Sequence, residues 1–150
     1  MEEFRKAIAG ARSILFLADN CGEIVLDRLL IEQMPRDRLT IAVRGAAVLN
    51  DATLDDARVA GLDTLAPVID NGSDAPATLL ADCARDFRRI FREAEVIIAK
   101  GQGDYESLSD VDGHFFFLFK VKCPVVARHA GLPLNAHALL RSPTGPCPPT

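Results

Sequence analysis

The sequence has 150 residues, of which 49% are hydrophobic and 25% charged, and its formal net charge is −4. This size allows one compact core, so we expect a single domain over residues 1–141. An acidic chain has no general attraction to nucleic acid, and charged residues interrupt every apolar run before the roughly 20 residues that span a bilayer. We therefore expect neither a nucleic-acid nor a membrane partner. The N-terminus lacks the features of a secretory signal, which predicts a cytoplasmic protein.

Short apolar, β-branched segments alternate with longer amphipathic ones, which is typical of βαβ units around a parallel sheet. We therefore predict an α/β fold. The predicted elements, in chain order, are strand 14–18, helix 23–33, strand 39–44, helix 54–60, strand 65–69, helix 77–94, strand 96–99, helix 115–120 and strand 124–127. Prolines crowd residues 142–150, so we predict a disordered tail there.

Local residue types support several of these boundaries. Thr53 is expected to cap the helix at 54–60, and Gly61 to close it in the left-handed conformation. Pro76 suits the first turn of the predicted helix at 77–94. The phenylalanines near residue 117 are expected to pack in the core.

Acidic and amide side chains follow the first two predicted strands. Asp19 and Asn20 come directly after the first strand, and Asp51 lies between the second strand and the next helix. Ligands bind at the carboxyl ends of strands in an open parallel sheet, so these side chains should converge. Two carboxylates and an amide form an incomplete oxygen shell for Mg²⁺ or Mn²⁺. Because Asp and Asn also form turns and helix caps, the residues alone leave a purely structural role open.

Lys100 ends the fourth predicted strand, and Gly101 and Gly103 follow it. A lysine beside exposed loop amides suits a phosphate group, because glycines let the backbone approach an anion closely. A flexible turn is the alternative, since the segment matches neither a Walker loop nor a full dinucleotide fingerprint. The scattered histidines, and cysteines without a CxxC pair, are assigned no site.

Four motifs together resemble one protein family. They are LADNCGEIV at 17–25, Arg44-Gly45 with NDAT at 50–53, DNGSDAP at 70–76 and KGQGDYE at 100–106. In this order they are similar to the damage-control phosphatases, formerly the domain of unknown function eighty-nine, whose members include proteins once described as acidic-residue methyltransferases. The resemblance covers about residues 4–131.

The resemblance implies a Rossmann-like three-layer α/β/α sandwich with a mainly parallel sheet. It also implies that Asp19, Asn20 and Asp51 hold a divalent cation, which is Mg²⁺, Mn²⁺, Co²⁺ or Ni²⁺. Lys100 would contact the phosphate of a small phosphorylated metabolite, either a sugar phosphate or a damaged phosphometabolite. The expected reaction is hydrolysis of a phosphate monoester, with Asp19 and Lys100 as the catalytic residues. Further substrate contacts are expected from Arg44, Gly72, Ser73, Gly101 and Gly103.

The sequence also departs from the family pattern. Asp104 stands where related sequences often have Asn, and Ala77 stands where Gly often follows the proline. Family members carry a helical region ahead of the Asp-Asn motif, and we expect that region to be absent here because the motif begins at Asp19. Two other functions remain open, namely a nucleotide- or S-adenosylmethionine-type methyltransferase and a non-catalytic metal- or metabolite-binding module.

Overall fold

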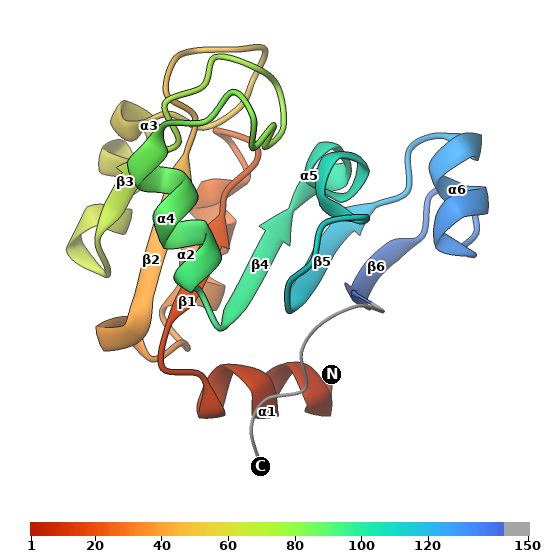
Figure 1. The fold of residues 1–150 in the computed structure, drawn as a ribbon, viewed down its shortest axis with the longest axis horizontal. Helices are drawn as coiled ribbons and strands as arrows, with labels where there is room; N and C mark the ends of the chain where they lie inside the picture. Colours follow the sequence, from red (N-terminus) through yellow and green to blue (C-terminus); the bar gives the residue numbers. More distant parts are fainter. Residues whose placement is uncertain (143–150) are drawn as a thin grey trace.

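The computed structural model describes residues 1–142. Its centre is a six-stranded sheet with the strand order β3-β2-β1-β4-β5-β6 (Figure 1). Each neighbouring pair from β3 to β5 is parallel, whereas β6 is antiparallel to β5. The predicted α/β fold with a mainly parallel sheet is therefore confirmed.

The strands are β1 (Ile14–Leu17), β2 (Leu39–Val43), β3 (Val68–Asp70), β4 (Val96–Lys100), β5 (Phe115–Lys120) and β6 (His137–Arg141). The α-helices are α1 (Glu2–Gly10), α2 (Ile24–Ile31), α3 (Leu54–Val59), α4 (Arg85–Glu93), α5 (Gly101–Leu108) and α6 (Pro124–Ala130). Two short 3-10 helices are η1 (Arg36–Arg38) and η2 (Leu62–Thr64).

Helices cover both faces of the sheet because strand side chains alternate between two apolar clusters. On one face, Phe16 and Ile98 pack with buried residues of α1, α2 and α3. On the other face, Leu17 and Ala99 pack with residues of α4, α5 and α6. Strands β1 and β4 are buried along their whole length, as expected for central strands of a parallel sheet. These two clusters produce the three-layer α/β/α sandwich.

Residues 115–120 form strand β5, so the helix predicted there is wrong. Phe115, Phe117 and Phe119 enter one apolar cluster, whereas Phe116 enters the other. This period of two marks a strand that is buried on both faces. A short, unbroken apolar run does not separate such a strand from a buried helix.

Residues 124–127 belong to helix α6, so the strand predicted there is also wrong. Pro124 occupies the first turn, where its missing N–H removes no helical hydrogen bond, and the Cys123 Sγ accepts from the Val126 amide at 3.5 Å. Gly131 closes the helix with φ of 66°. The next strand is β6, for which no strand was predicted.

The segment between β3 and β4 contains less helix than predicted. Helix α4 begins at Arg85, and residues 77–84 form turns and loop, so Pro76 does not begin a helix. Ala77 has φ of 64°, outside the right-handed helical region. The strand predicted at 65–69 is shifted to Val68–Asp70.

The start and end predicted for α3 are confirmed. The Thr53 hydroxyl accepts from the Asp56 amide at 3.5 Å, and the Asp56 carboxylate accepts from the Thr53 amide at 2.9 Å. This reciprocal pair is a capping box. Gly61, with φ of 72°, follows the helix in the left-handed conformation. The capped start fixes where the helix begins after Asp51.

The proline-rich segment, apart from Ser142, lies outside the described residues. Ser142 is buried, and its amide donates to the Phe115 carbonyl at 3.0 Å. None of the helices in residues 1–142 is long and apolar enough to cross a membrane.

Gly45 allows the loop after β2 to lie against the loop after β3. A Cβ atom at residue 45 would lie 2.6 Å from the Gly72 carbonyl carbon and 2.7 Å from the Ser73 nitrogen.

Gly45→Ala is therefore expected to lower the free energy of unfolding by about 1 to 3 kcal/mol in urea titrations. Gly10→Ala is the control, because nothing lies within 4 Å of a Cβ added there. Equal stability of the two variants would contradict the prediction.

Candidate active site

Backbone hydrogen bonds join the loops that follow β1 and β2. Asn20 and Asp51 form an isolated antiparallel bridge, and the Ala52 amide donates to the Asp19 carbonyl at 2.7 Å. Figure 1 shows the loops after β1, β2 and β3 gathered at one end of the sheet, with α1 at the other. The two acidic segments therefore meet at the carboxyl edge, where ligands bind in sheets of this kind.

The side chain of Asn20 also has a structural role. Its Oδ1 accepts from the Gly22 amide at 2.8 Å and from the Glu23 amide at 3.3 Å. These bonds organise the turn that leads into α2. The turn-forming role that the sequence left open is therefore present, and Asn20 fixes the loop that carries Asp19.

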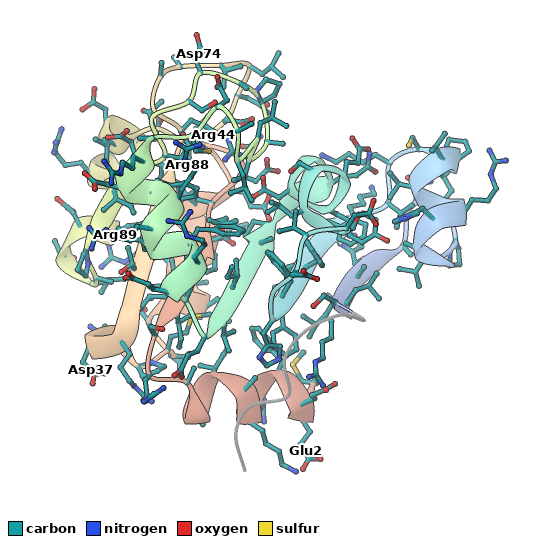
Figure 2. The ribbon with its side chains drawn as sticks, in the orientation of Figure 1. Glu2, Asp37, Arg44, Asp74, Arg88 and Arg89 are labelled. Carbon is teal, nitrogen blue, oxygen red and sulfur yellow. The ribbon has the colours of Figure 1, made fainter. Side chains whose placement is uncertain are left out.

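Arg44 lies among the loops at the carboxyl edge of the sheet (Figure 2). Its almost fully buried side chain joins three segments of the chain. Its Nε donates to Asp51 Oδ2 at 2.7 Å, Nη1 donates to Thr78 Oγ1 at 3.1 Å, and Nη2 donates to Asp104 Oδ1 at 3.3 Å. Burial alone lowers the pKa of Arg44, but Asp104 and Asp51 raise it above its ordinary value. Arg44 thus remains charged and holds Asp51 in place. We predicted that Arg44 contacts the substrate, but these three hydrogen bonds are all with the protein itself.

Negative charge exceeds positive charge around Arg44. Burial, and then the charge of Asp51, raise the pKa of Asp19 above its ordinary value. Burial raises the pKa of Asp104 to about 6, although Arg44 opposes the shift. The Oδ2 atom of Asp104 is buried and has no hydrogen-bond partner among the described residues. A bound cation would relieve the repulsion between the carboxylates of Asp19 and Asp51.

The residues present fit a hard divalent cation. Asp19 and Asp51 supply carboxylate oxygens. Asn20 Oδ1 accepts from the Gly22 and Glu23 amides, so it would bind a cation in place of one of these hydrogen bonds. Within residues 1–142, no three His, Cys, Asp or Glu side chains are grouped so as to hold a metal ion. A ligand set built on these two carboxylates therefore has no third side chain of these types in the described residues, and water or an amide oxygen would complete it.

Gly101 brings the start of α5 against Asp19. A Cβ atom at residue 101 would lie 2.1 Å from Asp19 Oδ2, and φ of Gly101 is 84°. Only glycine accommodates both constraints. Gly101 and Gly103 lie in the first turn of α5, where amides have no intrahelical acceptor. The first turn of α5 therefore begins beside the Asp19 carboxylate.

The other predicted loop donors are already engaged by the protein. The Gly72 amide donates to Asp70 Oδ1 at 2.9 Å, and the Ser73 amide donates to Asn71 Oδ1 at 3.0 Å. The Ser73 hydroxyl donates to the Asp82 carboxylate. The structure therefore assigns Gly72 and Ser73 to the loop scaffold, and substrate contact by either stays a prediction.

Lys100 is buried beside two carboxylates that belong to the start of α2. Its ammonium donates to Asp27 Oδ1 at 2.7 Å and also to the Glu23 carboxylate. Burial alone lowers the pKa of Lys100, but Asp27 and Glu23 raise it above its ordinary value. Lys100 is therefore charged, and its contact with a substrate phosphate stays a prediction.

Lys122 is a cation near this site that was not among the residues predicted from the sequence. It follows β5, and its amide donates to Gln102 Oε1 at 2.6 Å. Burial and the charge of Asp51 raise the pKa of Asp19, whereas the positive charges of Arg44 and Lys122 lower it. No carboxylate in the described part of the chain lies within 4.0 Å of the Lys122 ammonium. Assigning residues 115–120 to a strand would have placed Lys122 at the carboxyl edge.

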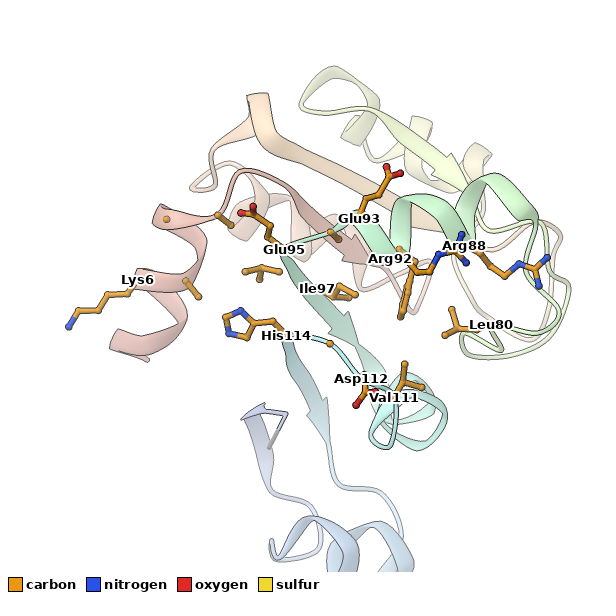
Figure 3. Close-up of a pocket in the computed structure, with 17 residues that line it drawn as sticks. Lys6, Leu80, Arg88, Arg92, Glu93, Glu95, Ile97, Val111, Asp112 and His114 are labelled. Atoms are coloured by element: carbon orange, nitrogen blue, oxygen red, sulfur yellow. The ribbon is translucent and has the colours of Figure 1, made fainter. Parts of the chain in front are cut away.

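A separate cavity of about 740 Å³ lies at the amino ends of β4 and β5 (Figure 3). Its wall includes Phe91, Ile97 and Val111, together with the buried side chain of His114. None of the predicted site residues lines it. The cavity is thus distinct from the acidic site at the opposite edge of the sheet.

The family model of the damage-control phosphatase ARMT1-like domain matches residues 1–137. The chain belongs to this family. It is 39% identical over 145 residues to the damage-control phosphatase PH1575 of Pyrococcus horikoshii, a match that covers 94% of this chain and 50% of that protein. It is 40% identical over 136 residues to the uncharacterized protein MJ0202 of Methanocaldococcus jannaschii, covering 87% of this chain and 45% of the relative.

The fold agrees with a solved relative. The crystal structure of a DUF89 family protein from Pyrococcus horikoshii matches with a TM-score of 0.90 and 38% identity, covering 94% of this chain and 51% of that one. A damage-control phosphatase of Archaeoglobus fulgidus is 38% identical over 123 residues, covering 79% of this chain and 43% of the relative. The chain thus spans about half the length of the relatives that it matches.

Asp104→Asn should change how stability depends on pH in the metal-free protein. Because the pKa of Asp104 is about 6 when folded and 3.8 ordinarily, the folded state binds this proton more tightly than the unfolded state. Asp104 therefore lowers the stability of the wild type as pH rises from about 4 to about 6. The unfolding free energy of the variant minus that of the wild type should therefore rise by up to about 3 kcal/mol from pH 4 to pH 7.

Denaturant titrations at several pH values, with a chelator present, measure this difference. Asp86→Asn, at an exposed position of α4, is the control and should show no comparable divergence. Parallel pH curves for wild type and Asp104→Asn would mean that Asp104 ionises at its ordinary pH.

Proposed function

We propose that this chain carries the active site of a divalent-metal-dependent phosphatase that hydrolyses phosphate monoesters of small metabolites. The bridge between Asn20 and Asp51 carries the proposal, because it brings the residues of two acidic strand ends side by side. Membership of a damage-control phosphatase family supports the same reaction class. The proposed substrates are sugar phosphates or damaged phosphorylated metabolites.

Asp19, Asn20 and Asp51 would hold the cation, which is Mg²⁺, Mn²⁺, Co²⁺ or Ni²⁺ in this proposal. When bound, the cation supplies Lewis-acid polarisation of a phosphate oxygen or a water molecule. Arg44 orients the Asp51 carboxylate through the Nε contact of 2.7 Å. Because Arg44 holds the Asp51 carboxylate, that carboxylate needs little rearrangement to bind a cation.

Positive groups of the chain would bind the phosphate of the substrate. The first-turn amides of α5, at Gly101 and Gly103, point toward the carboxyl edge, and the helix N-terminus favours an anion. Lys122 adds an exposed positive charge beside them, and Lys100 a buried one. Hydrolysis of a phosphate ester depends mainly on such positioning and charge neutralisation. The segment after β1 carries carboxylate and amide groups instead of a glycine-rich turn, which favours this reaction over methyl transfer.

Removal of metal should abolish phosphate release. The protein is treated exhaustively with a chelator, metal loss is checked by elemental analysis, and phosphate release is measured on a panel of sugar phosphates and a chromogenic monoester. We expect turnover to fall at least about 100-fold and to return with added Mg²⁺, Mn²⁺, Co²⁺ or Ni²⁺. Full turnover by the metal-free protein would contradict the proposed chemistry. Metal binding without turnover on any substrate would instead favour a non-catalytic binding module.

Asp51→Asn should weaken cation binding while preserving the fold. The substitution keeps the shape of the side chain but removes one of two proposed carboxylate ligands, so the dissociation constant for Mn²⁺ should rise about tenfold or more. Titration calorimetry measures the affinity, and thermal unfolding checks the fold. Asp55→Asn, in the exposed first turn of α3, is the charge-matched control. Unchanged Mn²⁺ affinity in folded Asp51→Asn would exclude Asp51 as a ligand.

A further inference from the structure

The two carboxylates on Lys100 differ in their exposure to solvent. The Asp27 side chain is 7% exposed, whereas the Glu23 side chain is 43% exposed. Both accept from the same ammonium. Asp27 lies within α2 on the buried side of that helix, and Glu23 immediately precedes the helix. Only Glu23 can leave the ammonium and be solvated without unpacking α2.

The cluster of Lys100, Asp27 and Glu23 carries a net negative charge when all three groups are ionised. A phosphate ester is an anion, so it would be repelled by this cluster as it stands. An ammonium has three N–H donors and no acceptor, and two of them are already directed at carboxylates. Lys100 can favour a phosphate electrostatically only if one carboxylate moves away.

Glu23 also lies close to the metal-binding side of the site. Burial and Asp51 are the larger causes that raise the pKa of Asp19, and the charge of Glu23 is a smaller cause in the same direction. The Glu23 amide donates to Asn20 Oδ1 at 3.3 Å, so the backbone at Glu23 is fixed while the side chain reaches Lys100. A rotamer change of this half-exposed side chain is therefore enough to free one N–H donor of the ammonium, while Asp27 still holds it.

We propose that Glu23 is a displaceable counter-ion of Lys100, which substrate phosphate replaces, whereas Asp27 is a positioning residue that keeps the ammonium in place. The inference rests on the proposed function, because it takes Lys100 as a phosphate contact. Glu23 thereby opposes binding of anions that cannot compete for the ammonium. It favours ligands whose phosphate reaches both the cation site and Lys100.

The test measures binding of inorganic phosphate by titration calorimetry at saturating Mg²⁺. Glu23→Gln removes the competing charge, so phosphate should bind about three- to fivefold more tightly than to the wild type. Glu93→Gln, on the exposed end of α4, removes one negative charge away from the site and should change the affinity by less than about twofold. Thermal unfolding confirms that each variant is folded.

The same comparison in a Lys100→Met background isolates the contact between the two side chains. Lys100→Met should weaken phosphate binding, and adding Glu23→Gln to it should give no gain. Glu23→Ala in the wild-type background should reproduce the gain of Glu23→Gln, so the test does not depend on one variant.

The outcomes separate this inference from the proposed function. Phosphate binding by the wild type without a gain in Glu23→Gln or Glu23→Ala overturns the counter-ion role and leaves the phosphatase proposal standing. A gain that persists in Lys100→Met also overturns it, because Glu23 would then act through another group. Failure of wild type and variants alike to bind phosphate overturns both.

Discussion

The buried guanidinium of Arg44 is the charge around which the carboxyl edge of the sheet is arranged. It follows β2 directly, and its contacts reach the loop before α3 through Asp51, the loop before α4 through Thr78, and α5 through Asp104. A buried charge is unfavourable without its partners, so the positions of these segments depend on one another. The carboxylate proposed to bind a cation is thus held by the fold before any ligand arrives.

The sheet separates two groups of charges at this edge. Alternation along β4 directs Lys100 to the same face as Ile98, where α2 supplies Asp27 and Glu23. Arg44 follows Ala42, whose side chain lies in the cluster on the opposite face. Two cations therefore approach the strand ends from opposite sides, each with its own carboxylates.

Much of the fold could be predicted because the central strands are short apolar runs that end at polar residues. This pattern located β1, β2 and β4, and with them the positions of Asp19, Asn20 and Lys100 at strand ends. It failed at 115–120 and 124–127, where an unbroken apolar run and an N-terminal proline each suit two structures. The ion pairs could not be predicted, because Arg44 and Asp104 are 60 residues apart and Lys100 and Asp27 are 73 apart. Sequence spacing carries no information on such distances.

The strand order has a consequence for how the chain folds. Strand β1 pairs with β2 on one side and with β4 on the other, and β4 begins only at Val96. During synthesis, the pairing of β1 with β2 and the bridge between Asn20 and Asp51 require nothing beyond Ala52, whereas the second edge of β1 stays unpaired until β4 has been made. Non-local parallel pairing of this kind is slow and leaves strand edges open to association with other chains. The acidic loops can therefore assemble early, while the Arg44–Asp104 link and the closed core form late.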